Sequence, residues 1–421
     1  MKMRIMAGIG KIIDRKEWML VIAGYLFAAL YIGVGIKQNY FQGNPFTISK
    51  QKFVLIMSIV TGLGLLGILH RLGTPIIAKR IENELSKLHP FGEADDTPRL
   101  ISVIKEGKIL TYVFYSRHIS LLQYQSNRDA LETVLNTQIV SIEQGRDKRH
   151  TLIKGVSSRS SLPDIAEWKD SYLSNKDFEL IMGVSLIGTE SIDLNSTPHL
   201  LIGGGTGSGK SVLMKLLMMQ CYMKGATVYI ADFKGGVDYS EIWHRNCAII
   251  TEPKTLIDKL TKILQILECR KALLIDSKCS DISHYNKSHN EKINRVIIAC
   301  DEVAEVLDKT GLSKDEKELV SQIESALSTI ARLGRAFGIH LFLATQRPDA
   351  DILKGQIKNN IAVRVCGRAD RVLSNIILES PEAAEKIPQD GQGLFMMNNG
   401  QIFKAYLIDD MSIGQNAGEG D

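Results

Sequence analysis

The chain has 421 residues, of which 44% are hydrophobic and 23% are charged, so we expect two or three globular domains with real cores. Its net charge of +4 is too small to indicate a nucleic-acid partner, which has to be argued from local clusters. The six cysteines show no C-x-x-C spacing, which argues against a zinc site or a disulfide framework and favours a reducing compartment: Cys221, Cys247, Cys269, Cys279, Cys300 and Cys366.

Two uncharged apolar runs lie near the start of the chain, Trp18–Ile36 and Phe53–Leu69. As helices they would be roughly 26–28 Å long, close to the ~30 Å hydrocarbon core of a bilayer. The pattern predicts two membrane spans within residues 1–76, and the alternative is a buried helical hairpin in a soluble protein. Lysine and arginine are denser outside the hairpin than in its connecting loop: Lys2, Arg4, Lys11, Arg15, Lys16, Arg71, Lys79 and Arg80 against Lys37, Lys50 and Lys52. We therefore expect a multi-pass protein of the cell membrane with both termini and the later domains in the cytoplasm.

Three further regions follow the predicted spans. Residues 77–99 are polar and contain the acidic stretch GEADD, which predicts a linker or the start of a helix leading away from the membrane. Residues 100–175 contain short apolar runs such as ILTYVFY and TQIVSIEQG and predict a small α/β domain. Residues 176–412 form the main domain, and residues 413–421 are predicted to be disordered.

A phosphate-binding loop is predicted at Gly204–Ser211, which reads GGTGSGKS and fits G-x-x-x-x-G-K-[ST]. The apolar run HLLIGG precedes it as a strand, and VLMKLLMMQCYMKG follows with helical spacing. Backbone N–H groups of Gly204, Gly205, Thr206, Gly207, Ser208 and Gly209 would surround phosphate oxygens of ATP. Lys210 would reach the β- and γ-phosphates, and Ser211 would bind Mg²⁺.

An acid pair is predicted at the end of NRVIIACDE, Asn294–Glu302. At the carboxyl end of a buried parallel strand these side chains would lie beside the phosphate-binding loop. Asp301 would organise Mg²⁺, and Glu302 would act as the general base for the attacking water.

The following segments complete an α/β pattern. Apolar residues from Leu319 to Leu333 recur at three- and four-residue steps and predict a long helix ended by Gly334 and Gly338. The strand HLFLATQRP then brings Gln346 to a strand end, where it would orient water or sense the nucleotide; a solvent-exposed turn residue is the alternative. Further strands are predicted at TVYIAD, CAIIT and AVRVCGR, and a hairpin at Asn399-Gly400. Strands alternating with helices predict a mainly parallel sheet covered on both faces.

The motifs PHLLIGGGTGSGKS, VIIACDEVAEVL, ARLGRAFGIHLFLATQRP and IKNNIAVRV resemble the FtsK/SpoIIIE family of DNA translocases, over about Leu180–Leu407. Two membrane spans joined to such a motor resemble the coupling proteins of Gram-positive integrative conjugative elements. The resemblance implies a RecA-like P-loop ATPase fold, a homohexameric ring with ATP at the subunit boundaries, and DNA in the central channel. It also suggests that Arg335 acts on the neighbouring subunit's ATP. Arg332, Arg347 and Arg364 are the alternatives, as is an ordinary surface role for Arg335.

The resemblance implies a membrane-anchored, ATP-driven DNA translocase that couples a relaxase–DNA complex to a conjugation channel. Family members that segregate chromosomes usually carry a DNA-reading winged-helix domain, for which no residues remain here, so we expect sequence-independent DNA contacts and specificity from a partner. Segments Lys278–Lys292 and Lys354–Lys358 are candidate DNA contacts or simply solvated loops, and Ala231–Tyr239 is a candidate channel or site-rim loop. The alternative functions are a motor for protein export and a slow ATPase that docks a relaxosome.

Overall fold

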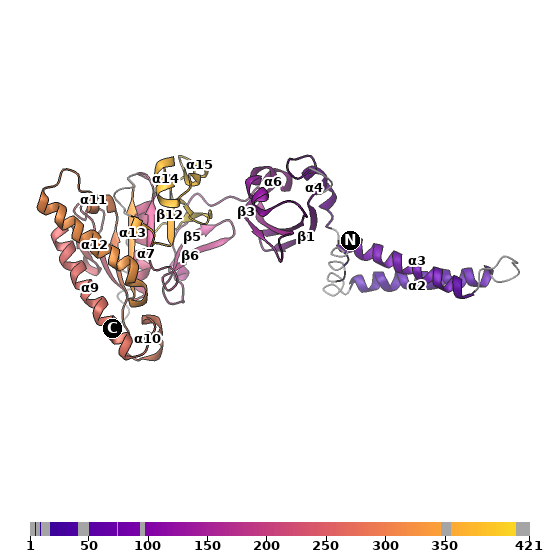
Figure 1. Ribbon diagram of the computed structural model, residues 1–421, viewed down its shortest axis with the longest axis horizontal. Helices are drawn as coiled ribbons and strands as arrows, with labels where there is room; N and C mark the ends of the chain where they lie inside the picture. The colour runs from indigo at the N-terminus through magenta and orange to yellow at the C-terminus, as the bar shows by residue number, and fades with distance from the viewer. Residues whose placement is uncertain are drawn as a thin grey trace. The chain divides into compact units, whose positions relative to one another are not determined.

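The computed structural model describes residues 17–40, 50–73, 75–92, 97–346 and 355–409, together with residues 5 and 9. The chain divides into two compact units, Met1–Ser160 and Ser161–Asp421 (Figure 1). The first unit contains a helical hairpin and a small sheet domain, and the second contains a large α/β domain. The predicted tail at 413–421 and Arg347 lie outside the described residues.

The hairpin consists of α2 (Glu17–Tyr40) and α3 (Lys50–Gly73). The Tyr25 hydroxyl donates to the Thr61 carbonyl at 3.2 Å, and Gly64 leaves room for the Tyr25 ring. Along the exposed sides of the hairpin lie large apolar side chains, including Leu20 and Leu30 at 75% and 67% exposure. Within the described residues, one helix is long and apolar enough to cross a membrane, Lys52–Leu72, and it contains the predicted second span. The apolar run of α2 is shorter, so the first span stays a prediction.

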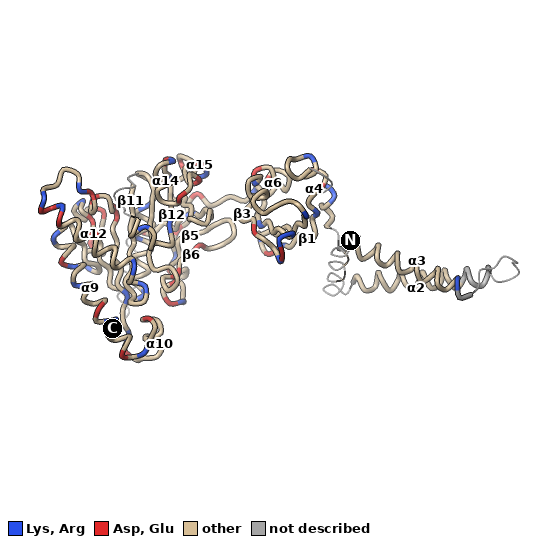
Figure 2. Tube along the Cα trace, viewed as in Figure 1, with Lys and Arg blue, Asp and Glu red and all other residues tan. Residues whose placement is uncertain are grey.

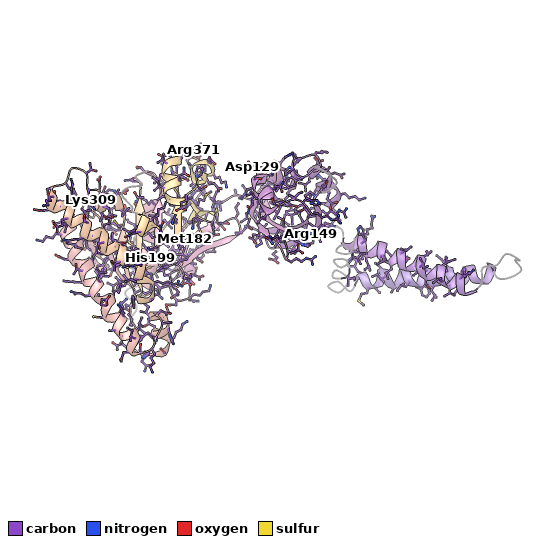
Figure 3. All side chains as sticks on the ribbon, in the orientation of Figure 1. Asp129, Arg149, Met182, His199, Lys309 and Arg371 are labelled. Atoms are coloured by element: carbon purple, nitrogen blue, oxygen red, sulfur yellow. The ribbon has the colours of Figure 1, made fainter. Side chains whose placement is uncertain are left out.

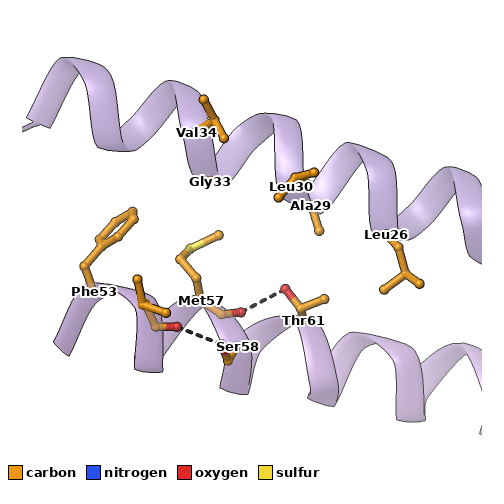
Figure 4. Close-up of a pocket in the computed structure, with 10 residues that line it drawn as sticks. Leu26, Ala29, Leu30, Gly33, Val34, Phe53, Met57, Ser58 and Thr61 are labelled. Carbon is orange, nitrogen blue, oxygen red and sulfur yellow. Dashed lines mark hydrogen bonds between the residues drawn. The ribbon is translucent and has the colours of Figure 1, made fainter. Parts of the chain in front are cut away.

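A groove of about 370 Å³ runs between α2 and α3 (Figure 4). The hydroxyls of Ser58 and Thr61 donate to the carbonyls of Val54 and Met57, one turn back in their own helix. These groups are therefore satisfied locally, as polar groups in an apolar surrounding must be. The groove wall is otherwise apolar: Leu26, Ala29, Leu30, Gly33, Val34, Phe53, Val54 and Met57.

The small domain has helices on one face of a four-stranded antiparallel sheet of order β1-β2-β4-β3. Its elements are α4 (Ala78–Leu85), β1 (Arg99–Glu106), β2 (Ile109–Tyr115), α5 (Leu121–Ser126), α6 (Arg128–Leu135), β3 (Thr137–Gln144) and β4 (His150–Ser157). Buried residues from helices and strands alike, including Leu85, Phe114 and Leu131, form its core. Strand residues alternate between core and surface, as in β2, where Tyr112 and Phe114 are buried and Val113 between them is not.

The boundaries of this domain differ from those expected from sequence. Ala78, Leu85 and Phe91 are fully buried in its core, so much of the expected linker, residues 77–99, belongs to the domain. The polar residues of α4, such as Lys79, Arg80 and Glu84, lie on its exposed side, whereas residues 93–96 of the acidic stretch lie outside the described residues. The division at Ser160 places residues 161–175 in the second unit, where the Trp168 N–H donates to the Leu407 carbonyl at 2.9 Å.

The second unit is built on a ten-stranded sheet of order β6-β5-β14-β13-β12-β7-β11-β10-β8-β9. Its strands are β5 (Glu179–Ser185), β6 (Gly188–Asp193), β7 (Leu200–Gly203), β8 (Thr227–Ala231), β9 (Ala248–Ile250), β10 (Val296–Cys300), β11 (Ile339–Thr345), β12 (Val363–Cys366), β13 (Leu394–Met397) and β14 (Ile402–Ala405). From β12 to β9 neighbouring strands are parallel, and from β6 to β12 they are antiparallel. The predicted mainly parallel sheet is confirmed, with an antiparallel extension on one side.

Helices cover both faces of this sheet (Figure 1). They are α7 (Lys210–Met223), α8 (Glu241–Asn246), α9 (Pro253–Asp276), α10 (Ile282–Ser288), α11 (Val303–Leu307), α12 (Lys314–Phe337), α13 (Gly355–Lys358), α14 (Arg371–Leu378) and α15 (Glu382–Lys386), with a 3₁₀ turn at Asp170–Tyr172. Leu201, Ile298 and Leu343 point into the core beneath α9 and α12. Their neighbours Ile202, Ile297 and Phe342 point into the core beneath α7. Central strands are therefore apolar on both faces, which is typical of parallel sheets.

The long helix α12 is capped at both ends. Ser313 forms a capping box with Glu316, and Gly338 ends the helix in the left-handed conformation with φ +63°. The prediction that Gly334 also ends the helix is wrong. Gly334 lies inside α12, which continues to Phe337. A Cβ at Gly334 would be 2.2 Å from the Ile339 carbonyl oxygen. The glycine serves close packing of the helix on the start of β11.

The unit begins and ends in neighbouring strands. β14 pairs with β5, and the Leu407 N–H donates to the Ala166 carbonyl at 2.7 Å. The predicted hairpin at Asn399-Gly400 is present between β13 and β14, with Gly400 at φ +82°. The segment that enters the second unit and the last described strand region of that unit therefore lie side by side.

Candidate nucleotide site

The glycine-rich loop joins β7 to the amino end of α7, as the sequence predicts. Gly207 and Gly209 have φ of +74° and +95°, which other residues adopt at a cost. The loop leaves no room for a side chain at Gly204, where a Cβ would be 2.5 Å from the Ser208 hydroxyl oxygen. That hydroxyl is buried and has no hydrogen-bond partner among the described residues. A tight backbone cradle at a helix amino end is an anion-binding arrangement.

Lys210 and Asp301 form a buried ion pair beside this loop. Lys210 and Asp301 are 7% and 6% exposed. The Lys210 ammonium lies 3.3 Å from Asp301 Oδ1. The ammonium also donates to the Asp301 backbone carbonyl. A buried charge needs such a partner because desolvation disfavours it otherwise.

Ser211 completes this group. Its hydroxyl donates to Asp301 Oδ2 at 3.2 Å, so the two oxygens that the sequence assigns to a metal lie next to each other. A hydroxyl and a carboxylate are hard oxygen ligands of the kind that Mg²⁺ prefers. The chain therefore offers a phosphate cradle and a pair of oxygens that fit ATP and Mg²⁺.

The carboxylate of Glu302 is held by the end of the neighbouring strand. Glu302 is 4% exposed, and its Oε1 accepts from the Thr345 hydroxyl at 2.7 Å and from the Ala304 N–H at 3.3 Å. Its Oε2 accepts from the Gln346 N–H at 2.9 Å. The parallel pairing of β10 with β11 brings these groups together at one edge of the sheet.

Gln346 links this carboxylate to the glycine-rich loop. Its side-chain carbonyl accepts from the Thr206 hydroxyl at 3.2 Å. A continuous polar chain therefore runs from Thr206 through Gln346 to Glu302. The sequence placed Gln346 at a strand end, and the structure brings it to the glycine-rich loop.

Arg368 is a site residue that the sequence reasoning missed. It follows β12, which is the other neighbour of β7, and its carbonyl accepts from the Gly205 N–H at 2.7 Å. Its guanidinium donates to the carbonyls of Thr206 and Gln389. The available signal was the GR pair at the end of AVRVCGR, a predicted strand whose carboxyl end reaches the same edge of the sheet.

Arg335 is not brought to this site within the chain. Its guanidinium is exposed and donates to the Asn195 carbonyl at 3.0 Å, on the side where β7 begins, whereas the glycine-rich loop follows the end of β7. Of the alternatives, Arg364 is paired with Glu379 at 2.6 Å, and Arg332 is exposed on α12. A role for Arg335 at ATP would therefore require a neighbouring subunit.

The candidate DNA segments have local structural roles. In 278–292, Asp281 caps α10, Tyr285 stacks on His289 at 4.1 Å, and the Lys292 ammonium donates to the His289 carbonyl. The Lys358 ammonium is paired with the Glu379 carboxylate, with 3.5 Å between Nζ and Oε1. Lys354 lies outside the described residues.

The loop 231–239 is anchored near the site. Asp232 accepts from the N–H groups of Lys234 and Gly236 at 3.1 and 3.0 Å. Lys215 of α7 donates to the Asp238 carbonyl at 2.6 Å and lies over the Tyr239 ring. The loop therefore packs on α7, the helix that begins with Lys210, and its role as a channel or site-rim loop stays a prediction.

A glycine-rich loop joins a parallel strand to a helix, with a buried lysine–aspartate pair beside it and a glutamate held at the end of β10. This arrangement defines a P-loop ATPase. The FtsK/SpoIIIE family pattern matches residues 164–350, and the chain belongs to this family. The resemblance seen in the sequence is thereby confirmed.

Similar proteins include a conjugation coupling protein. The monomer form of the pCW3 conjugation coupling protein TcpA with ATPγS is 35% identical, with a TM-score of 0.59, over 80% of this chain and 96% of that one. The DNA translocase FtsK of Treponema pallidum strain Nichols is 35% identical over 240 residues, which is 53% of this chain and 28% of that protein. FtsK of Helicobacter pylori strain J99 is 29% identical over 342 residues, 76% of this chain and 38% of that protein. The chain thus matches about a third of the length of these translocases.

Proposed function

We propose that this protein is a membrane-anchored, ATP-driven DNA translocase that acts as the coupling protein in conjugative DNA transfer. The observation that carries the proposal is the likeness to TcpA, a conjugation coupling protein, along 96% of that chain. The long apolar helix Lys52–Leu72 supports a membrane anchor. We propose a multi-pass anchor with both termini and the ATPase domain in the cytoplasm, as the lysine and arginine distribution suggests.

The residues of the site would divide the work of ATP hydrolysis. The glycine-rich loop and Lys210 would hold the phosphates, and Lys210 would exchange its contact with Asp301 for phosphate oxygens. Ser211 and Asp301 would hold Mg²⁺, which neutralises charge on the phosphates when bound. Glu302 would accept the proton of the attacking water.

The remaining functional parts of the proposal concern assembly and partners. A homohexameric ring would bring Arg335 of one subunit towards the ATP of the next, where an arginine in trans is worth on the order of 10³–10⁵ in rate. DNA would pass through the ring in largely sequence-independent contacts. Specificity would come from a relaxase and from proteins of the conjugation channel.

Steady-state ATP hydrolysis by the detergent-purified full chain tests this function, measured without DNA and with single- or double-stranded DNA. We expect DNA to stimulate hydrolysis strongly, and Lys210→Ala and Glu302→Gln to abolish the stimulated rate. Displacement of a protein roadblock from DNA then separates translocation from docking. Hydrolysis indifferent to both forms of DNA would favour a motor for protein export. Slow hydrolysis without roadblock displacement would favour an ATPase that docks a relaxosome.

A further inference from the structure

One end of the small domain's sheet gathers positive charge. It comprises the start of β1 and the two loops 116–120 and 145–149. A hydrogen bond from the Ser116 N–H to the Arg149 carbonyl, 3.0 Å long, connects the two loops. We call this surface the basic end. Five exposed cationic side chains lie on it, Arg99, Arg117, Arg146, Lys148 and Arg149, while these segments contain one carboxylate, Asp147. Figure 2 shows the basic residues of this domain, and Figure 3 shows Arg149 on one side of it and Asp129 on the other.

A tyrosine lies among these cations. Arg99, Tyr115 and His150 are direct cross-strand neighbours on β1, β2 and β4 and share one face of the sheet. The Tyr115 ring meets the His150 ring edge-on at 5.4 Å. A hydrogen bond from Arg117, and a further one from Arg149, lowers the pKa of the Tyr115 phenol. Two guanidiniums therefore converge on one half-exposed aromatic side chain.

The single carboxylate does not cancel this charge. Asp147 bonds to the His150 ring at 2.6 Å and lies 3.8 Å from Arg146. The His150 hydrogen bond lowers the pKa of Asp147, so the carboxylate stays charged and satisfied within its loop. The remaining cations give the basic end a strong attraction for phosphate groups.

The chain ties this domain closely to α3. Helix α3 ends at Gly73, and α4 begins at Ala78, which is fully buried in the core of the small domain. Five peptide steps reach at most about 18 Å. If α3 spans the membrane, as the proposed function requires, the folded domain lies against the lipid headgroups.

We propose that the basic end of the small domain docks on anionic lipid headgroups of the membrane that anchors the chain. This inference rests on the proposed membrane anchorage. Each lysine or arginine near an anionic leaflet attracts it over about a Debye length, so a tethered domain turns its most basic surface towards that leaflet. A tyrosine among the cations suits the headgroup region, where such rings gather. Single-stranded nucleic acid would favour a series of stacking aromatics, whereas Tyr115 is the one Phe, Tyr or Trp residue in or bordering these segments.

The experiment uses the full chain in nanodiscs of phosphatidylcholine, with or without phosphatidylglycerol. Amide hydrogen exchange is followed in segments 116–120 and 145–149. We expect slower exchange in the anionic discs and loss of this difference at high salt. Lys148→Gln with Arg149→Gln removes two cations, which should shift the balance between docked and undocked states about thirtyfold. The matched control, Lys105→Gln with Lys108→Gln, removes two exposed cations from the β1–β2 turn at the other end of the sheet and should change nothing.

Two results would overturn the inference. One is equal exchange in both kinds of disc. The other is protection that appears on adding DNA to discs without anionic lipid, which would assign the basic end to nucleic acid. A carbonate wash tests the membrane anchorage separately. If the chain is not anchored, the wash removes it from the discs. DNA-stimulated hydrolysis in the same discs reports on the proposed motor independently.

Discussion

Thr345→Val tests whether the end of β11 positions Glu302 for catalysis. The substitution keeps the shape of the side chain and removes the hydroxyl that donates to Glu302 Oε1 at 2.7 Å. That oxygen would keep only the longer contact to the Ala304 N–H at 3.3 Å. The Glu302 carboxylate would then be held less firmly, by the Gln346 N–H on Oε2 and by the Ala304 contact.

The magnitude follows from the kind of bond removed. A hydrogen bond to a charged group contributes about 1.5–3 kcal/mol. Were that contribution realised in the transition state, kcat would fall about tenfold to 150-fold. Thr345 contacts the glycine-rich loop through its backbone carbonyl, which accepts from the Gly204 N–H at 3.3 Å and is kept in the variant. Only the side-chain bond to Glu302 is lost, so we expect ATP affinity to remain within about twofold.

Single-turnover hydrolysis and nucleotide binding, measured on the same preparations, separate these effects. Thr345→Ser keeps a hydroxyl and should restore most of the lost rate. The reasoning fails if Thr345→Val hydrolyses ATP as fast as the unaltered chain, or if Thr345→Ser is equally slow. A parallel loss of ATP affinity and thermal stability would indicate a structural role instead.

Three other changes have defined outcomes. Arg368→Ala should weaken ATP binding about ten- to hundredfold by titration, because a guanidinium now held by neutral carbonyls is lost from the site rim; Arg371→Ala, paired with a surface carboxylate, should not. Burial lowers the pKa of His199 to about 4, so the unfolded chain binds a proton below about pH 6.5 and the folded one does not. This site should therefore lower stability by about 2 kcal/mol between pH 7 and pH 5. Burial also lowers the pKa of His340, so His199→Phe should keep part of the acid-induced fall in stability and lose about 2 kcal/mol of it; an equal fall in both proteins would contradict the reasoning. Gly334→Ala should destabilise the protein by about 1–3 kcal/mol in thermal unfolding, because the new methyl group meets the Ile339 carbonyl oxygen; an unchanged melting temperature would contradict this packing.

Motifs with a strict local pattern were predictable from sequence. The spacing of Gly204–Ser211 and the apolar strand before Asp301 specify their own surroundings, and the structure brings Lys210, Ser211 and Asp301 together. Their catalytic roles remain predictions. The alternation of buried strands with amphipathic helices was sufficient to predict the parallel part of the sheet.

Features that depend on long-range packing were not predictable in the same way. Arg368 reaches the loop only because β12 lies beside β7, although Arg368 is 162 positions from Thr206 in the sequence. The core position of α4 was hidden because a short helix with three buried residues looks polar in composition. Gly334 looked like a helix end because a glycine within a helix has the same sequence signal as one that ends it.

The adjacency of β5 and β14 determines how the second unit carries load. The connection from the first unit enters at Ser161. Hydrogen bonds from the Trp168 N–H to the Leu407 carbonyl and from the Leu407 N–H to the Ala166 carbonyl then fasten this entry segment to the last described strand region. A pull on the entry segment is therefore borne first by main-chain bonds at the margin of the antiparallel extension, while the nucleotide site lies on β7, β10 and β11, further into the sheet. Neighbouring ends also make the unit suited to circular permutation, in which a short linker joins them and new ends open in a surface loop. Such a rearranged ATPase would keep its site while its attachment point moves.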